Sequence, residues 1–416
     1  MAEVKIYNGN QIGGCITVIS SEKAKVMIDF GENLPGAEKV ETENEFDWES
    51  EKIDAVLFTH YHGDHIGRFK EIPKKIPLYM GKLTRQVMIT ISKYVKDEEA
   101  LRILQDETRV QTVIAAQSFE IEDIRVTPYM VDHSAFDAYM YLVETLEKII
   151  LHTGDFRGHG YRGKAVIPMI NKYIRKYGTR NVDVLITEGT MLSRMTEKIY
   201  SEADMLYDCK KLLKQHKYVF LICSSTNVDS LATFYQAAKS HHMKMYVNGY
   251  VYEQIDHYRE AAREYNGPYD FRYVYEYNPE KIIASNKLEK PTMQEEIMRK
   301  EGFVIVIKAE EKYRSWIERF ADLKPIVVYS MWEGYLNPKH KAYNDEWKKF
   351  LDSCNYVEYM HTSGHATASL IAEVINAVEP RESIYPIHTE NAKELEKLNI
   401  KEELRRRIYY GSAIQE

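Results

Sequence analysis

Short runs of apolar residues, separated by turn residues and amphipathic stretches, recur through the first half of the chain. They predict β-strands at 4–8, 15–20, 25–30, 51–59, 125–130, 138–143, 148–153 and 182–187. The run 51–59 ends in an almost continuous apolar segment, which is typical of a strand buried on both faces. Strands with helices between them predict a layered α/β architecture with sheets at its centre.

A second alternation begins at about residue 196. The pattern there predicts helices at 201–217 and 230–240, and strands at 218–223, 243–247, 303–307 and 325–329. We expect these elements to form a separate α/β domain over 196–345. The residues that follow, 346–416, are too few to form a domain alone, so we expect them to complete the domain that 1–195 begins.

The composition narrows the class of protein. Apolar residues make up 44% of the chain and charged residues 29%, which is the balance of a soluble globular protein and not of a disordered one. The formal net charge of −7 provides no general attraction to nucleic acid or to an anionic membrane. A nucleic-acid partner would therefore have to be held by a local basic surface.

No segment of the sequence predicts secretion or insertion into a membrane. The amino terminus has no apolar stretch behind a basic start, and no apolar run approaches the ~18 residues of a membrane helix. The four cysteines are scattered without C-x-x-C spacing, which is typical of buried thiols in a reducing compartment. We therefore expect a cytoplasmic protein without a membrane partner.

Metal-binding chemistry is predicted directly after the strand at 51–59, by the motif His60-x-His62-x-Asp64-His65. Histidines two residues apart on a loop that leaves a strand can bind one metal ion together, while Asp64 and His65 turn toward a second. The alternative is a histidine-rich surface loop without metal. With only 14 histidines in the chain, this spacing rarely arises by chance, so we favour the metal site.

Further candidate ligands stand at the ends of other predicted strands: His133, Asp155 and His388. Each alone is more often a structural hydrogen-bonding residue, but their shared placement favours ligands of the same centre. Asp29 ends the strand at 25–30, where it either accepts a hydrogen bond from a ligand histidine or terminates the strand at a glycine turn. Because His388 follows the second α/β domain and the other ligands precede it, both flanks must meet at one centre.

In order and spacing, these residues resemble the metallo-β-lactamase fold superfamily. The resemblance implies an αββα sandwich with two zinc ions at the edge of its two sheets, and Mn²⁺ is a further candidate in vitro. It implies that one ion is held by His60, His62 and His133, and that the other is held by Asp64, His65 and His388, with Asp155 bridging both.

Two further motifs resemble those of the β-CASP nucleases within this superfamily. Glu188-Gly189-Thr190 is similar to their acidic motif, although many members have Ser where this chain has Gly189. The segment His361-Thr362-Ser363-Gly364-His365-Ala366 is similar to the H-x-S-G-H-A motif of ribonuclease J. In those enzymes a β-CASP domain is inserted where residues 196–345 lie. Ribonuclease J normally has a further C-terminal domain, so we leave the oligomeric state open, a homo-oligomer included.

The resemblance implies a metal-dependent ribonuclease that acts on single-stranded RNA, endonucleolytically or from the 5′ end. It implies catalytic roles for Asp64, Glu188 and His365, with His365 as general acid, and a phosphate-binding role for Ser363, Gly364 and His365. The alternatives are a hydrolase of a small ester, thioester or lactam, and an inactive RNA-binding subunit. The sequence leaves open the choice between RNA and DNA and the dependence on the 5′-phosphate.

Overall fold

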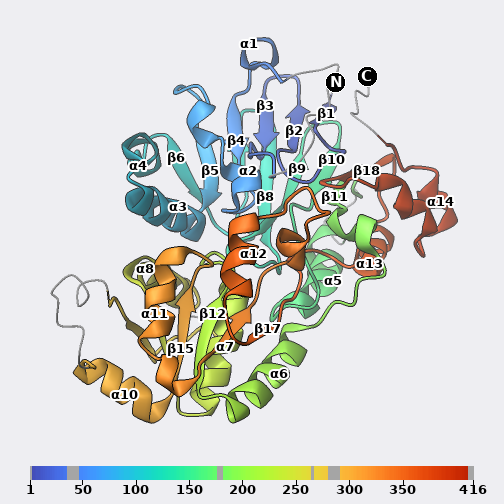
Figure 1. Ribbon diagram of the computed structural model, residues 1–416. Helices are drawn as coiled ribbons and strands as arrows, with labels where there is room; N and C mark the ends of the chain where they lie inside the picture. Colours follow the sequence, from blue (N-terminus) through green and yellow to red (C-terminus); the bar gives the residue numbers. More distant parts are fainter. Residues whose placement is uncertain (1, 35–45, 176–180, 264–266, 280–290, 411–416) are drawn as a thin grey trace. The chain divides into compact units, whose positions relative to one another are not determined.

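The computed structural model describes residues 2–34, 46–175, 181–263, 267–279 and 291–410. The chain divides into two compact units, one formed by Met1–Lys198 and Gly364–Glu416 and the other by Ile199–Ser363. In Figure 1 the first unit includes both ends of the colour range, because the chain leaves it after Lys198 and returns at Gly364. Each unit is described separately below.

Two six-stranded sheets form the centre of the first unit. The first sheet has the order β1 (Glu3–Tyr7), β2 (Ile16–Ser20), β3 (Lys25–Ile28), β4 (Ala55–Leu57), β5 (Leu78–Gly81) and β6 (Val110–Val113). The second has the order β18 (Ser383–Ile387), β11 (Val184–Glu188), β10 (Ile149–His152), β9 (Tyr139–Glu144), β8 (Ile124–Met130) and β7 (Phe119–Ile121).

Both sheets of the first unit combine antiparallel and parallel pairs. In the first sheet β1, β2 and β3 pair antiparallel, and β3 to β6 pair parallel. In the second sheet β7 to β10 pair antiparallel, and β10, β11 and β18 pair parallel. Apolar side chains from both sheets, Val26 and Leu57 among them in the first and Val126 and Ile150 in the second, form one buried cluster between the sheets. This cluster is the centre of the expected sandwich.

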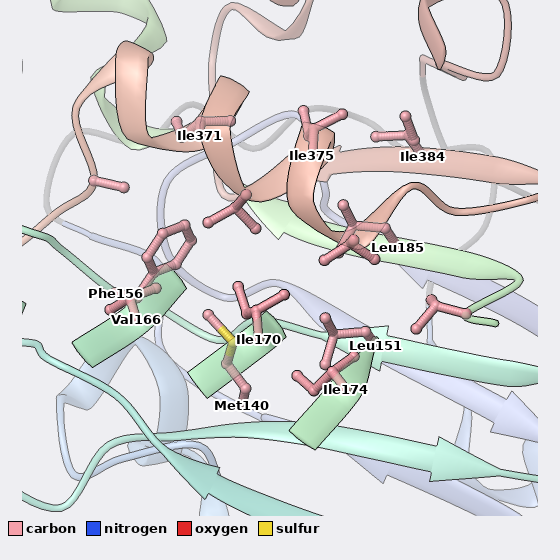
Figure 2. Close-up of a cluster of buried hydrophobic side chains, with 14 of the residues drawn as sticks. Met140, Leu151, Phe156, Val166, Ile170, Ile174, Leu185, Ile371, Ile375 and Ile384 are labelled. Atoms are coloured by element: carbon pink, nitrogen blue, oxygen red, sulfur yellow. The ribbon is translucent and has the colours of Figure 1, made fainter. Parts of the chain in front are cut away.

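Helices cover the outer faces of the sandwich. The helical elements of the first unit are α1 (Trp48–Glu51), α2 (Gly63–Ile66), η1 (Phe69–Glu71), α3 (Lys82–Val95), α4 (Glu98–Gln105), η2 (Gly163–Ala165), α5 (Val166–Met169), η3 (Ile170–Ile174), η4 (Thr190–Arg194), α13 (Ala368–Val378), η8 (Ala392–Lys397) and α14 (Glu402–Arg405). Figure 2 shows Ile170, Ile371 and Ile375 packed against Leu151 and Leu185 of the second sheet. Helices α3 and α4 contact the strands β5 and β6 of the first sheet. The layers therefore follow the expected αββα order.

The second unit contains one six-stranded parallel sheet. Its order is β14 (Val274–Glu276), β13 (Lys244–Val247), β15 (Phe303–Ile307), β12 (Tyr218–Ile222), β16 (Ile326–Tyr329) and β17 (Val357–Tyr359). Its helical elements are α6 (Glu202–Gln215), α7 (Val228–Ser240), α8 (Gly249–Ala261), α10 (Met293–Glu301), η5 (Glu311–Tyr313), α11 (Arg314–Glu318), η6 (Ala321–Leu323), η7 (Glu333–Leu336) and α12 (Asp345–Asp352). Met298, Trp316 and Phe350 of α10, α11 and α12 pack on one face of the sheet.

The far boundary of the second unit differs from the expected one. We placed it at residue 345, whereas the unit extends to Ser363. The intervening elements are α12, which buries Phe350 and Leu351 in the core of the second unit, and β17, which pairs in parallel with β16.

Within the described residues, no helix combines the length and apolarity that crossing a membrane requires.

Candidate metal centre

The predicted ligands lie at one edge of the sandwich because of strand direction. In the second sheet β10, β11 and β18 run parallel. β8 runs parallel to β10 as well, since each is antiparallel to β9. The carboxyl ends of these strands therefore lie at the same edge, and His133, Asp155 and His388 follow three of them. From the first sheet, β3 and β4 contribute Asp29 and the loop that begins with His60.

Three histidines form the first group of candidate ligands. His60 Nε2 lies 3.0 Å from His62 Nδ1, and His133 Nε2 lies 3.1 Å from the same atom. His60 and His133 are buried, and His62 is half-buried at the start of α2. These three nitrogens converge on one point, as the ligands of a single metal ion do.

The second group combines two carboxylates with two histidines. His65 Nε2 is 3.1 Å from Asp155 Oδ2, and His388 Nε2 is 3.2 Å from Asp64 Oδ2. The ring centres of His65 and His388 are 5.0 Å apart. The segments before and after the second unit thus meet at one centre, as the order of the ligands requires.

The ring nitrogens that point away from the other candidate ligands determine which tautomer each histidine adopts, and thereby whether a cation fits these groups. His65 Nδ1 lies 2.8 Å from Asp29 Oδ2, and His133 Nδ1 lies 2.6 Å from the carbonyl oxygen of Gly364. A carboxylate and a carbonyl can only accept, so both rings donate through Nδ1. When such a ring is neutral, its Nε2 carries a lone pair, and that lone pair faces the other ligands.

His60 and His388 follow the same rule through threonine hydroxyls. His60 Nδ1 lies 3.0 Å from Thr59 Oγ1, and this hydroxyl donates its proton to Asp29 Oδ2 at 2.8 Å. The hydroxyl oxygen can then accept a hydrogen bond from His60. His388 Nδ1 lies 2.8 Å from Thr190 Oγ1. Lone pairs that converge on each other and on carboxylates repel one another unless a cation lies between them, so both groups fit divalent cations such as zinc.

Burial and the neighbouring charged residues determine the pKa values of these histidines. Burial, reinforced by neighbouring histidines, holds the pKa of His60 well below its ordinary value. Burial also lowers the pKa of His62 to about 4. For His65 burial opposes the charged form, but Asp155 and Asp64 outweigh it and raise the pKa well above its ordinary value. The first group therefore presents neutral rings, and the second attracts positive charge.

Asp29 and His388 both have left-handed backbone conformations, with φ of 61° and 53°. Non-glycine residues rarely adopt this region, and it is found at sites where the surrounding contacts over-determine the conformation. Asp29 accepts hydrogen bonds from the backbone N–H and the hydroxyl of Thr59 and from His65. One aspartate thus positions the histidine loop at both of its ends.

Glu188 lies beside the metal-binding groups at the end of β11. Its Oε1 accepts hydrogen bonds from the backbone N–H of Ala366 at 2.9 Å and of Phe156 at 3.3 Å. Its Oε2 accepts from Thr190 N at 3.1 Å and lies 3.5 Å from His365 Nδ1. Three backbone donors therefore hold this buried carboxylate in place against His365.

His365 lies between two carboxylates. Its Nδ1 is 3.4 Å from Asp155 Oδ2 as well as 3.5 Å from Glu188 Oε2, so these three residues form a further group of potential ligands. Burial opposes the charged ring, but both carboxylates outweigh it and raise the pKa of His365. Helix α13 begins at Ala368, because the side chain of Thr367 caps it, so His365 stands ahead of the helix.

The residues predicted to bind phosphate stand where the chain passes from one unit to the other. Ser363 is the last residue of the second unit, and Gly364 and His365 belong to the first. The carbonyl oxygen of Gly364 accepts a hydrogen bond from His133 Nδ1. The sequence did not predict contacts of candidate ligand histidines with this carbonyl, with Thr59 or with Thr190. The threonines stand directly before His60 and within the acidic motif, and their placement is the only signal that could have pointed to them.

Comparisons with known proteins agree with this geometry. Residues 26–221 match the β-lactamase superfamily domain, and residues 353–410 match the Zn-dependent metallo-hydrolase RNA specificity domain, RMMBL. Endoribonuclease ysh1 of Schizosaccharomyces pombe is 28% identical over 45% of this chain and 25% of its own length. Ribonuclease J of Helicobacter pylori is 28% identical over 43% of this chain and 26% of its own. The chain thus matches about a quarter of these relatives.

A crystal structure of a protein of unknown function from Enterococcus faecalis is similar over the whole of both chains, with a TM-score of 0.66 and 16% identity. At this identity the likeness supports the fold alone. The two domain matches agree with the sandwich and the candidate ligand set: residues 26–221 resemble the β-lactamase superfamily domain, and residues 353–410 resemble the RNA specificity domain of Zn-dependent metallo-hydrolases.

Proposed function

We propose that this protein is a two-zinc hydrolase that cleaves phosphodiester bonds in single-stranded RNA. The observation that carries the proposal is the pair of ligand groups next to the Glu188–His365 pair, in a chain that matches an RNA specificity domain. The names of the relatives, ribonuclease J and endoribonuclease ysh1, support RNA as the substrate. A hydrolase of a small ester, thioester or lactam would have no use for that domain.

The two ligand groups would each hold one cation. In this proposal the first is held by His60, His62 and His133, and the second by Asp64, His65 and His388. Asp155 would contribute a carboxylate oxygen to both positions. Two divalent cations bound in this way stabilise negative charge on the attacking and leaving oxygens of a displacement at phosphorus. Zinc is the choice that the histidine-rich first group favours.

The residues of the chain supply orientation and a proton. Backbone N–H groups hold Glu188, and its carboxylate orients His365 through Nδ1. The His365 side chain remains 22% exposed, so the Nε2 side of the ring can reach a substrate. In that position His365 donates a proton to the leaving oxygen as general acid. Contacts of Ser363 and Gly364 with the substrate phosphate remain predictions from the motif.

The remaining proposals concern surroundings and partners. We place the protein in the cytoplasm, which its four free thiols favour. Single-stranded RNA is the proposed partner.

A direct test is incubation of the zinc- or manganese-loaded protein with end-labelled single-stranded RNA. DNA of the same sequence and RNA that bears a 5′-monophosphate or a 5′-triphosphate are tested in parallel. We expect metal-dependent RNA cleavage. Hydrolysis of a small ester or lactam without RNA cleavage would contradict the proposal.

Three variants test the division of labour at the centre. His365→Ala should retain both metals and lower RNA turnover by ~10²–10⁴-fold, the range of general acid–base groups. His388→Ala should lose one metal and nearly all activity. Glu188→Gln should resemble His365→Ala but be milder, since it removes only the orienting partner. Metal content and cleavage rate of each variant are the measurements, and loss of metal in His365→Ala would assign that residue to the ligands.

A further inference from the structure

Thr190 is a buried residue in direct contact with the last ligand of the metal centre. It is 2% exposed and follows β11, one residue after Gly189. Its Oγ1 lies 2.8 Å from Nδ1 of His388 and 3.2 Å from the carbonyl oxygen of the same residue. One hydroxyl thus contacts both the ring and the backbone of His388.

Counting protons determines the direction of these two hydrogen bonds. A carbonyl oxygen can only accept, so the single hydroxyl proton of Thr190 is donated to the backbone of His388. The hydroxyl oxygen is then left as an acceptor, and the His388 ring must donate to it through Nδ1. In the neutral ring, Nε2 consequently presents its lone pair toward Asp64 Oδ2, 3.2 Å away.

The backbone of His388 needs the same support. Its φ of 53° is unusual for a residue with a side chain, and such conformations cost of order 1–3 kcal/mol. A hydrogen bond stabilises the conformation, because the carbonyl oxygen of His388 accepts from Thr190 Oγ1. Thr190 therefore stabilises both the side-chain rotamer and the backbone conformation of His388.

Neighbours of Thr190 hold the hydroxyl in position. Glu188 Oε2 accepts a hydrogen bond from the backbone N–H of Thr190 at 3.1 Å. Gly189 leaves no space for a side chain, because an added Cβ would lie 2.7 Å from Leu192 Cδ1 and 3.0 Å from Thr389 Cβ. The turn 188–190 thus has one function toward His365, through Glu188, and another toward His388, through Thr190.

We propose that Thr190 is a positioning residue that selects the Nδ1–H tautomer of His388 and aims its Nε2 at the second metal position. The inference rests on the proposed two-metal centre and adds to it the residue that prepares one ligand. The turn 188–190 accordingly positions both histidines that the carboxyl-terminal segment contributes to the centre, His365 and His388.

Zinc titration of the metal-free protein, followed by calorimetry, tests the inference without using RNA. Thr190→Val keeps the shape of the side chain and removes the hydroxyl. It should weaken binding of the second zinc equivalent by about 10- to 100-fold, the usual effect of removing the hydrogen-bond partner of a metal-bound histidine. The first equivalent should be unaffected. Thr190→Ser keeps the hydroxyl and should restore the affinity.

Two further measurements separate positioning from a general structural defect. Thr187→Val removes another buried hydroxyl of the same segment, one that contacts no ligand histidine, and should bind both equivalents like the wild type. Long-range ¹H–¹⁵N spectra of the zinc-loaded protein should show His388 bound through Nε2 with its proton on Nδ1, and Thr190→Val should lower the fraction of His388 in this form at a zinc concentration that saturates the wild type. His388 resonances are assigned by their loss in His388→Gln.

Unchanged affinity for the second zinc in Thr190→Val, or an equal loss in Thr187→Val, would overturn the inference. A wild-type protein that binds two zinc ions without cleaving RNA would contradict the proposed substrate but leave this result intact. Binding of fewer than two equivalents by the wild type would overturn both.

Discussion

Each buried histidine among the candidate metal ligands is oriented by a specific partner of its outer ring nitrogen. For His65 and His60 the partners come from the neighbouring strand end or residue, Asp29 and Thr59. For His133 the partner is the carbonyl of Gly364, which lies 231 residues further along the chain. A buried ring nitrogen without a partner is costly, so these contacts select tautomers as well as positions.

Gly364 should tolerate no side chain. An added Cβ would lie 2.8 Å from Ser134 Oγ and 3.3 Å from His133 Cε1, so Gly364→Ala must displace either the ring or the carbonyl that accepts from it. We expect affinity at the first metal position to fall by ~10-fold or more. Zinc titration of the purified variant is the measurement.

A second substitution makes this prediction specific. Ser134→Ala removes the hydroxyl that an added Cβ would contact, so the double variant Gly364→Ala/Ser134→Ala should recover part of the lost affinity. Gly267→Ala, in the second unit, meets only a tyrosine ring at 3.3 Å and serves as a control. Wild-type zinc affinity in Gly364→Ala would show that the space at this position is not needed.

At the scale of elements, strand ends position the centre and buried ion pairs join the helices of the second unit. Glu295 lies in the first turn of α10, where it completes a capping box with Thr292. Its carboxylate also accepts from Arg319 at 2.5 and 2.6 Å and from the hydroxyl of Tyr277 at 2.8 Å. One buried side chain thus links α10 to the segments after β14 and α11.

Burial opposes the charged form of Glu295, but Arg319 outweighs it and lowers the pKa from 4.5 to about 2. A folded-state pKa below the unfolded value means that the ionised carboxylate stabilises the fold above about pH 4.5 and progressively less as the pH falls toward 2. Glu295→Gln should therefore lower the free energy of unfolding by about 3 kcal/mol near neutral pH. Denaturant unfolding at about pH 7 and about pH 3 should show the difference from wild type shrinking by more than half.

Asp352→Asn provides the matched control in the same unit. This carboxylate is 60% exposed and pairs with Lys348 one helical turn away. Exposed pairs contribute within about 1 kcal/mol, so the variant should unfold like the wild type at both pH values. Equal destabilisation by Glu295→Gln at both pH values would mean that its charge is not responsible.

At the scale of the molecule, the candidate metal centre joins two distant parts of the chain. Its candidate ligands come from residues 60–155 and from His388, and the whole second unit lies between them in sequence. Cations that bind only the folded state add RT ln(1 + [L]/Kd) to its stability, about 4 kcal/mol at a thousandfold excess over Kd. Metal binding should therefore stabilise the first unit against unfolding.

Metal removal should lower the thermal midpoint by several degrees. Elemental analysis of protein purified without chelator should find two equivalents of zinc, and calorimetric scans with and without chelator should differ. His388→Ala should show a smaller difference between the scans, while His365→Ala should resemble the wild type. An unchanged midpoint together with less than one equivalent after metal supplementation would contradict a structural contribution of the centre.

Local patterns in the sequence were sufficient for most of the elements and for the chemistry. Strands such as β2, β8 and β12 are runs of apolar and β-branched residues, and H-x-H-x-D-H concentrates metal-binding side chains after one of them. The β-lactamase superfamily domain was likewise correctly expected from the motifs. The region of β5, β6, α3 and α4 was not assigned from the sequence. Strand β6, for example, contains Gln111 and Thr112 and so forms no apolar run.

Tertiary structure alone decided which residues orient the candidate ligands and where the second unit ends. Thr190 contacts His388 because β11 and β18 pair in parallel with Glu188 opposite Ile387, and that register brings together residues 198 apart in sequence. β17 joins the second unit because its edge pairs with β16. A sequence specifies side-chain chemistry and local period, whereas hydrogen bonds between distant residues depend on strand order and register, which non-local packing determines.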